Sequence, residues 1–206
     1  MGKLNMKDWI GQTILNKKVI SIPIMTHPGI ELIGKTVHDA VTNGQVHYEA
    51  LKALCATVIM DLTVEAEAFG AEIIFPENEV PSVSGRLLAD EAAIDALEIP
   101  ALNKGRIAQY LKANMLTAKN ITDRPVLAGC IGPYSLAGRL YDMSEIMMLI
   151  YINPEAANTL LRKCTDFIIR YCMALKATGV NGVVMAEPAA GLLSNEDCLQ
   201  YSSVFV

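Results

Sequence analysis

Two short apolar runs, separated by a long stretch of helical periodicity, form the clearest pattern along this chain. Residues 126–131 end at Gly132-Pro133, and residues 182–186 end at Glu187-Pro188. Between them, apolar residues recur at helical spacing through residues 154–177. The two runs are predicted to be parallel strands, because a helical connection of this length brings the chain back in the same direction.

The same alternation of helix and strand occurs earlier in the sequence. Gly70 precedes the apolar run 71–75 just as Gly179 precedes the run 180–184, and glycine at this point is typical of a helix C-cap. Further strands are predicted at residues 19–25 and 57–60. The pattern indicates an α/β fold, the (β/α)8 TIM barrel, of which this chain would form the N-terminal half to two-thirds. An open doubly wound sheet produces the same local signals.

The remaining predicted elements are helices bounded by recognisable caps. Asn153-Pro154-Glu155 begins a helix that reaches Ala177, and Ser194 is placed as the N-cap of the last helix. Asn103 is placed before another helix. The other helices are predicted at residues 6–16, 36–41, 46–54, 89–97 and 104–118, with a short strand or extended loop at 80–84.

The chain is interpreted as a single domain, residues 1–206, because no linker or low-complexity tract divides it. A parallel barrel needs eight strands in roughly 250 residues, and this pattern supplies fewer. We therefore expect the chain to be the N-terminal portion of a larger barrel.

Composition narrows the class of protein. The 52% of hydrophobic residues and the mean hydropathy of +0.32 fit parallel strands that are covered on both faces. Polar or charged residues interrupt every apolar run before it reaches the length of a membrane helix, and the first residues lack the apolar centre of a signal peptide. A cytoplasmic location without membrane association is expected.

Charge and cysteine content argue against two further classes, nucleic-acid-binding proteins and proteins held together by a disulfide framework. A net charge of -5 and a pI near 5.2, with no clustered basic face, argue against nucleic acid as a partner. The five cysteines, an odd number without close pairs in the sequence, suit a reducing compartment and are interpreted mainly as buried structural thiols.

Candidate chemistry lies where the predicted strands end, because active sites of barrels sit at that edge. Asp61 and Glu187 are the candidate catalytic carboxylates, and we expect them to face one shared cleft. Asp61 could instead cap the helix that follows it. His27 is the only histidine at a predicted strand end, and it is either a proton donor or a histidine held by loop hydrogen bonds.

Other residues at the same predicted edge are assigned to substrate binding: Thr26, Gly132, Pro133 and Tyr134. Gly132 and Pro133 would shape the turn, and the Tyr134 ring either lines the pocket or packs in the core. Three glutamates, Glu65, Glu67 and Glu72, are interpreted as solvated.

An ordered series of motifs resembles the uroporphyrinogen decarboxylase superfamily, and more closely its methylcobamide:coenzyme M methyltransferase branch. The series begins with a short match that includes Asp61, in residues 60–62 and 68–70. It continues with residues 132–140, 153–155, 179–190 and 193–194. The resemblance covers most of the chain from Ile22 and implies a barrel with a catalytic aspartate after its second strand.

Departures from the family pattern separate its branches. Decarboxylases carry an arginine-bearing loop after the first strand that grips the carboxylates of a tetrapyrrole, and residues 25–30 contain no arginine. Arg139 stands about where decarboxylases have a tyrosine near the substrate. The resemblance therefore disfavours uroporphyrinogen decarboxylation.

The methyltransferase branch implies transfer of a methyl group from a methylated corrinoid, such as methylcobalamin or a corrinoid protein, to a small acceptor. The acceptor would be a thiol such as coenzyme M, or a pterin. Zinc activates the thiol in this branch through a His-x-Cys pair and a distant Cys in the C-terminal half. None of His27, His38 and His47 has a cysteine at that spacing, so no metal site is expected here and zinc is expected only in a complete homologue.

The alternative interpretation is a non-catalytic half-barrel that docks a corrinoid protein or a C-terminal half. In either case the chain alone is expected to be inactive. Its unpaired strand edges are expected to favour self-association into a homo-oligomer.

Overall fold

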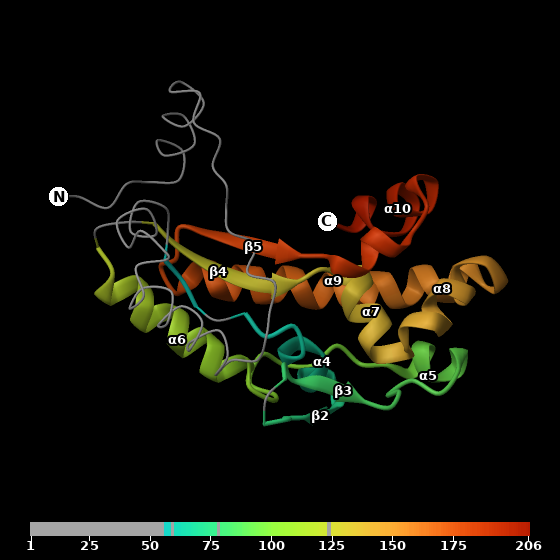
Figure 1. Ribbon diagram of the computed structural model, residues 1–206, viewed down its shortest axis with the longest axis horizontal. Helices are drawn as coiled ribbons and strands as arrows, with labels where there is room; N and C mark the ends of the chain where they lie inside the picture. The colour runs from blue at the N-terminus through green and yellow to red at the C-terminus, as the bar shows by residue number, and fades with distance from the viewer. Residues whose placement is uncertain (1–55, 59, 78, 123–124) are drawn as a thin grey trace, which may run out of the picture.

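The computed structural model describes residues 56–58, 60–77, 79–122 and 125–206 (Figure 1). The helices expected at 6–16, 36–41 and 46–54 and the strand expected at 19–25 lie outside these residues.

Three parallel strands form the central sheet: β1 (Ala56–Thr57), β4 (Val126–Ile131) and β5 (Gly182–Ala186). Their order is β1-β4-β5, with Thr57 opposite Leu127 and Ile131 opposite Ala186. The predicted strands at 126–131 and 182–186 are confirmed, together with their parallel direction. The strand expected at 57–60 is instead the two-residue β1, so Asp61 lies farther from a strand end than expected.

Three helices connect β4 to β5: α7 (Pro133–Tyr141), α8 (Met143–Ile152) and α9 (Pro154–Ala177). The long helix α9 packs against both strands and runs along them in Figure 1. Asn153 caps α9 as predicted, because its side-chain oxygen accepts a hydrogen bond from the N–H of Ala156. The apolar stripe of α9 is buried at Leu160, Leu161, Cys164, Phe167, Ile168, Tyr171 and Leu175.

The break between α7 and α8 falls at Asp142, which the hydrophobic pattern did not indicate. Asp142 has a φ of 81°, a backbone conformation that non-glycine residues rarely adopt. Its carboxylate accepts hydrogen bonds from the N–H groups of Ser144 and Glu145. The side chain therefore caps α8 while the backbone turns the chain away from α7.

The apolar run 71–75 contains a strand, but the expectation that this strand is buried is wrong. β2 (Glu72–Ile74) pairs antiparallel with β3 (Ser82–Ser84) in a separate two-stranded sheet, and Ile74 is half exposed. Pro76 and Pro81 lie between the two strands and disfavour a longer run. The extended segment predicted at 80–84 corresponds to β3.

The other helices of this region agree in part with the sequence patterns. Gly70 is the left-handed C-cap of α4 (Val64–Phe69), as predicted, with a φ of 105°. α5 (Glu91–Ala96) falls inside the predicted helix. α6 (Ile107–Asn120) begins three residues later than expected, with Arg106 rather than Asn103 at its N-cap position. Gly105, with a φ of 52°, forms a turn immediately before α6 and delays the helix start.

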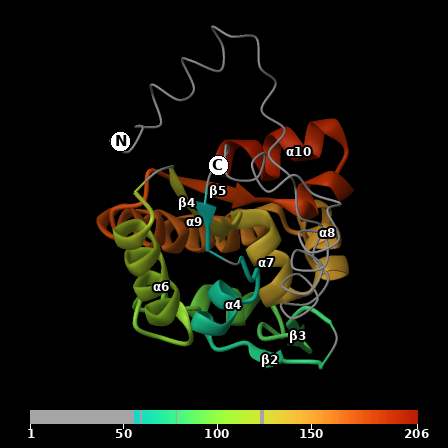
Figure 2. The same ribbon diagram turned by 60° about the vertical axis from the view of Figure 1, so that its left-hand side comes forward.

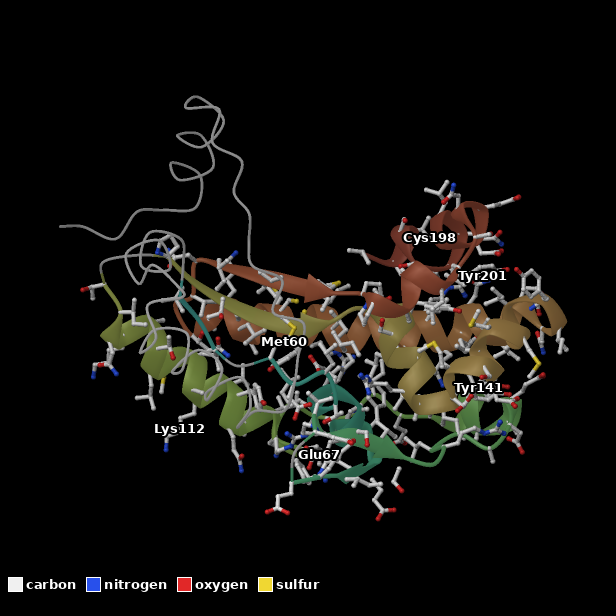
Figure 3. All side chains as sticks on the ribbon, in the orientation of Figure 1. Met60, Glu67, Lys112, Tyr141, Cys198 and Tyr201 are labelled. Carbon is white, nitrogen blue, oxygen red and sulfur yellow. The ribbon has the colours of Figure 1, made fainter. Side chains whose placement is uncertain are left out.

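The C-terminal segment consists of η1 (Pro188–Leu192), α10 (Asn195–Tyr201) and η2 (Ser203–Phe205). Ser194 caps α10 as predicted, and the buried Tyr201 hydroxyl donates to the carbonyl of Ile150. Figures 1 and 2 both place α10 across the sheet from the β2–β3 pair, and Figure 3 labels Tyr201 on that helix. No described helix combines the length and the apolar character needed to cross a membrane.

Candidate functional site

Asp61 lies between β1 and α4, and protein groups engage both of its carboxylate oxygens. Oδ1 accepts hydrogen bonds from the N–H and the hydroxyl of Thr63, at 2.8 and 2.7 Å. Oδ2 accepts from Nη1 of Arg106 at 2.5 Å, and only 2% of the Asp61 side chain is exposed. Asp61 therefore orders the entry to α4 through Thr63, although Thr63 rather than Asp61 occupies the N-cap position, and its catalytic role stays a prediction.

Arg106 joins α4 to the turn before α6. Besides its bond to Asp61, its guanidinium donates to Oε2 of Glu67 at 2.6 Å and to the Thr63 hydroxyl at 2.8 Å. The guanidinium also lies over the Phe75 ring, 4.8 Å from its centroid. Glu67 is thus an ion-pair partner, with its side chain 25% exposed, rather than the freely solvated residue that the sequence suggested. Figure 3 labels Glu67, which belongs to α4.

Glu65 is the residue that sequence reasoning placed wrongly. It is 2% exposed, its Oε1 accepts a hydrogen bond from the N–H of Ile131 at 3.0 Å, and its Oε2 has no partner among the described residues. Burial raises its pKa from the usual 4.5 to about 7, against the lowering effect of the Ile131 bond, and the nearby Asp61 adds to the rise. The sequence did contain an indication that Glu65 is buried, because Glu65 shares a helix face with the apolar Ala68 and Phe69.

Glu187 directly follows β5 and holds the start of α7. Its carboxylate accepts hydrogen bonds from the N–H of Tyr134 at 2.9 Å and of Ser135 at 2.6 Å. Burial raises its pKa, and these bonds to Ser135 and Tyr134 oppose the rise. Backbone N–H groups at a helix start favour a carboxylate, so Glu187 joins the ends of β4 and β5.

Gly132 is required by this arrangement. A Cβ added there would lie 2.2 Å from Oε2 of Glu187, closer than any real contact. Pro133 occupies the first position of α7, where its missing N–H costs no hydrogen bond. Both residues shape the turn after β4 as expected, and their role in substrate binding stays a prediction.

Tyr134 lies entirely in the core. Its exposed fraction is 0%, and its hydroxyl has no hydrogen-bond partner among the described residues. The ring therefore has the packing role that was its alternative, while its backbone N–H contributes to the bond with Glu187. Thr26 and His27 lie outside the described residues.

The structure brings Glu65 and Glu187 to one edge of the sheet. Because β1, β4 and β5 are parallel neighbours, their C-terminal ends meet at the same edge. Glu65 bonds to Ile131 at the end of β4, and Glu187 bonds to the turn that follows. The cleft expected between Asp61 and Glu187 stays a prediction.

Arg139, on the last turn of α7, is a further charged group at this edge. Burial lowers its pKa, while the negative charges of Asp61 and Glu65 oppose the change. We find no hydrogen bond or ion pair from its side chain to any residue that the structure describes. A partly buried guanidinium in this state can bind an anionic group.

The described residues form no site for a metal ion. No group of three His, Cys, Asp or Glu side chains within the described ranges lies close enough together to hold a metal ion. A groove of 560 Å³ runs between α9, β5 and the C-terminal residues, away from Asp61. The strand-end residues therefore offer proton-holding and anion-binding groups.

Replacing Glu65 with glutamine is expected to remove a pH dependence of stability. Because the pKa of Glu65 rises on folding from 4.5 to about 7, the folded protein binds the extra proton. The stabilisation is fully present below pH 4.5 and is lost as the pH rises to about 7, by up to about 3 kcal/mol.

Urea unfolding of E65Q and the native sequence between pH 4.5 and 8 measures this effect. The two proteins should have similar stability at the acid end, and E65Q should be the more stable at pH 8. The exposed Glu77 provides the control E77Q, whose difference from the native sequence should not vary with pH. A constant difference for E65Q would contradict the assignment.

Replacing Glu187 with alanine is expected to destabilise the fold by about 2 kcal/mol, because two N–H groups at the start of α7 lose their acceptor. E187Q retains one acceptor oxygen and should cost less. Urea unfolding measures both, with E77A as the control on an exposed glutamate. Equal stability of E187A and E77A would show that Glu187 does not anchor α7.

Comparison with known proteins places this geometry in context. Residues 40–205 match the family described as "Uroporphyrinogen decarboxylase (URO-D)". The methylcobamide:CoM methyltransferases MtbA of Methanosarcina acetivorans and Methanosarcina mazei are 30% and 31% identical to the chain over 135 residues, covering 65% of this chain and 40% of each relative. A uroporphyrinogen decarboxylase of Legionella pneumophila (strain Paris) is 26% identical over 157 residues, covering 73% of this chain and 44% of the relative.

A solved structure shows the same relationship. A methyltransferase from Methanosarcina mazei superposes with a TM-score of 0.66 and 25% sequence identity, covering 81% of this chain and 48% of that chain. The barrel fold predicted from the sequence is confirmed by this likeness and by the family match. The chain spans less than half the length of these relatives.

Proposed function

The chain belongs to the uroporphyrinogen decarboxylase family, and from that premise we propose that it forms part of the mouth of a corrinoid-dependent methyltransferase barrel. The reaction would move a methyl group from a methylated corrinoid or corrinoid protein to a thiol such as coenzyme M, or to a pterin. The names of the MtbA relatives support this branch. Because the chain covers only part of each relative, the activity is proposed for the complete barrel.

The observation that carries the proposal is the set of charged groups at the ends of the parallel strands. Asp61 and Glu65 lie there with the guanidinium of Arg139, which has no hydrogen-bond or ion-pair partner among the described residues. Glu65 can hold a proton near neutral pH in a setting that excludes water, as acid–base residues do. Arg139 supports an acceptor with an anionic end, because guanidinium binds such groups in a fixed orientation.

Uroporphyrinogen decarboxylation has less support, although decarboxylases occur among the relatives. A tetrapyrrole with several carboxylates needs several cations, and residues 25–30 supply no arginine. A single arginine on α7 fits a small acceptor better than a polycarboxylate.

Methyl transfer is expected only when the rest of the barrel is present. Since the described residues hold no metal-binding group, thiol activation must come from residues that they do not include. The test joins this chain to the C-terminal part of an MtbA relative and measures demethylation of methylcobalamin with coenzyme M as acceptor. The chain alone should show no turnover, and the joined protein should be active.

In the joined protein, R139L should raise the KM for the anionic thiol, with less effect on an uncharged thiol. Substitution of Lys112, which lies on α6 in Figure 3, provides the control K112L. Turnover by the chain alone would contradict the proposal that thiol activation needs the rest of the barrel. Inactivity of a folded joined protein with both free and protein-bound corrinoid would favour the non-catalytic docking module.

A further inference from the structure

Two cysteines from different elements lie in contact beside the end of β4. Cys130 of β4 and Cys172 of α9 have their sulfur atoms 3.9 Å apart, although 42 residues separate them in the sequence. Cys130 is 1% exposed, whereas Cys172 is partly exposed and lines the groove beside α9. One thiol is therefore open to a small reagent and the other is held behind it.

We propose that Cys130 and Cys172 form a redox-active dithiol that closes to a disulfide by exchange with a small-molecule disulfide of the oxidised glutathione class. A disulfide bond is about 2.05 Å long, so the two sulfur atoms need to approach by about 2 Å for the bond to form. Sequence spacing does not indicate this pair, because the contact depends on how α9 packs against β4.

The exchange balances in two steps. The Cys172 thiolate attacks one sulfur of the small disulfide, the bond between that reagent's sulfurs breaks, and one small thiol leaves with a proton. Cys130 then loses its proton to solvent, and its sulfur attacks the Cys172 sulfur and releases the second small thiol. The protein dithiol is oxidised by two electrons, and the reagent is reduced to two thiols.

The surroundings assign the first step to Cys172. The hydrogen bond from Cys130 lowers the pKa of Cys172, which favours the attacking thiolate. That interaction and burial raise the pKa of Cys130, with the charges of Glu65 and Glu187 contributing to the rise. The partly exposed residue is thus also the more nucleophilic one.

The remaining described cysteines provide matched controls. Cys164 lies in the same helix as Cys172 and is fully buried, and Cys198 lies on α10, where Figure 3 labels it. Within the described ranges, neither has a second sulfur at hydrogen-bond distance. C164A and C198A should therefore leave the dithiol intact.

The test incubates the folded, fully reduced chain with oxidised glutathione, blocks the remaining thiols and maps the peptides by mass spectrometry. Cleavage after lysine and arginine places Cys130 and Cys172 in separate peptides, residues 120–139 and 171–176. The expected product is a disulfide linking these peptides, reversed by a dithiol reductant and formed equally in C164A and C198A. C130A should instead retain one glutathione on Cys172, and C172A should leave Cys130 unmodified.

Circular dichroism during oxidation shows whether the protein stays folded. Absence of the linked peptide from folded protein would overturn the proposal. So would a linked peptide that forms only after addition of denaturant, or a stable glutathione adduct on Cys172 while Cys130 is still present.

Discussion

Replacing Arg106 with leucine is expected to lower the free energy of unfolding by about 3–5 kcal/mol, because the substitution leaves the Asp61 carboxylate buried without its cation. The same change removes the hydrogen bond to Thr63 and the contact with Phe75. These contacts join α4 to the start of α6, so the loss should appear as a single lower midpoint in urea unfolding.

A matched variant distinguishes the contribution of the buried Arg106–Asp61 ion pair from that of the more exposed Arg106–Glu67 ion pair. E67Q removes the second carboxylate that Arg106 binds. Because Glu67 is more exposed than Asp61, this substitution should lower the free energy of unfolding by about 1 kcal/mol or less. A double variant, R106L with D61N, should recover part of the stability, because the isolated charge is then gone. An R106L protein as stable as E67Q would show that the buried ion pair does not hold this region together.

Replacing Phe167 with alanine is expected to cost about 3–5 kcal/mol, the range for removal of a large aromatic side chain from a packed core. Phe167 lies in the middle of α9 with an exposed fraction of 0%, and its ring centroid is 5.0 Å from Phe69 and 6.4 Å from Tyr171. The ring therefore joins α9 to α4 as well as filling the core. Thermal and urea unfolding both measure the loss.

Ile169 gives the control on the same helix, because 56% of its surface is exposed. I169A should stay within about 0.5 kcal/mol of the native sequence, as most surface substitutions do. A similar loss for both variants would mean that α9 is sensitive along its whole length rather than at the buried ring.

The region from β4 to β5 could be predicted from the sequence because each element carries its own boundary. Asn153 and Pro154 begin α9 in the structure as the sequence indicated, and the strands agree at 126–131 and 182–186. Only the break at Asp142 escaped notice, since its positive φ is an unusual choice for an aspartate.

The apolar run at 71–75 shows where pattern alone fails. A short apolar run can predict a strand but not the strand with which it pairs. Here β2 pairs with β3, the next strand along the chain, rather than with the central sheet. The late start of α6 has a tertiary origin as well, because the N-cap position holds Arg106, whose side chain reaches Asp61.

The candidate site could be predicted in outline only. Strand-end position identified Asp61 and Glu187, but their partners lie 45 and 52 residues away, and no local pattern specifies such contacts. Glu65 was missed because glutamate is rarely buried. The resemblance placed Arg139 near the substrate, but Arg139 was not named as a site residue, because a single basic residue near a helix end usually meets solvent or the helix carbonyls.

The bonds between Glu187 and the start of α7 also bear on the order in which the chain folds. α7, α8 and α9 contact one another as near neighbours in sequence, whereas Glu187 must return across 52 residues to reach Ser135. Contacts between distant segments form late, because closing a long loop costs entropy before any contact compensates for it. During synthesis, α7 must therefore wait with its first N–H groups uncapped until residue 187 has left the ribosome.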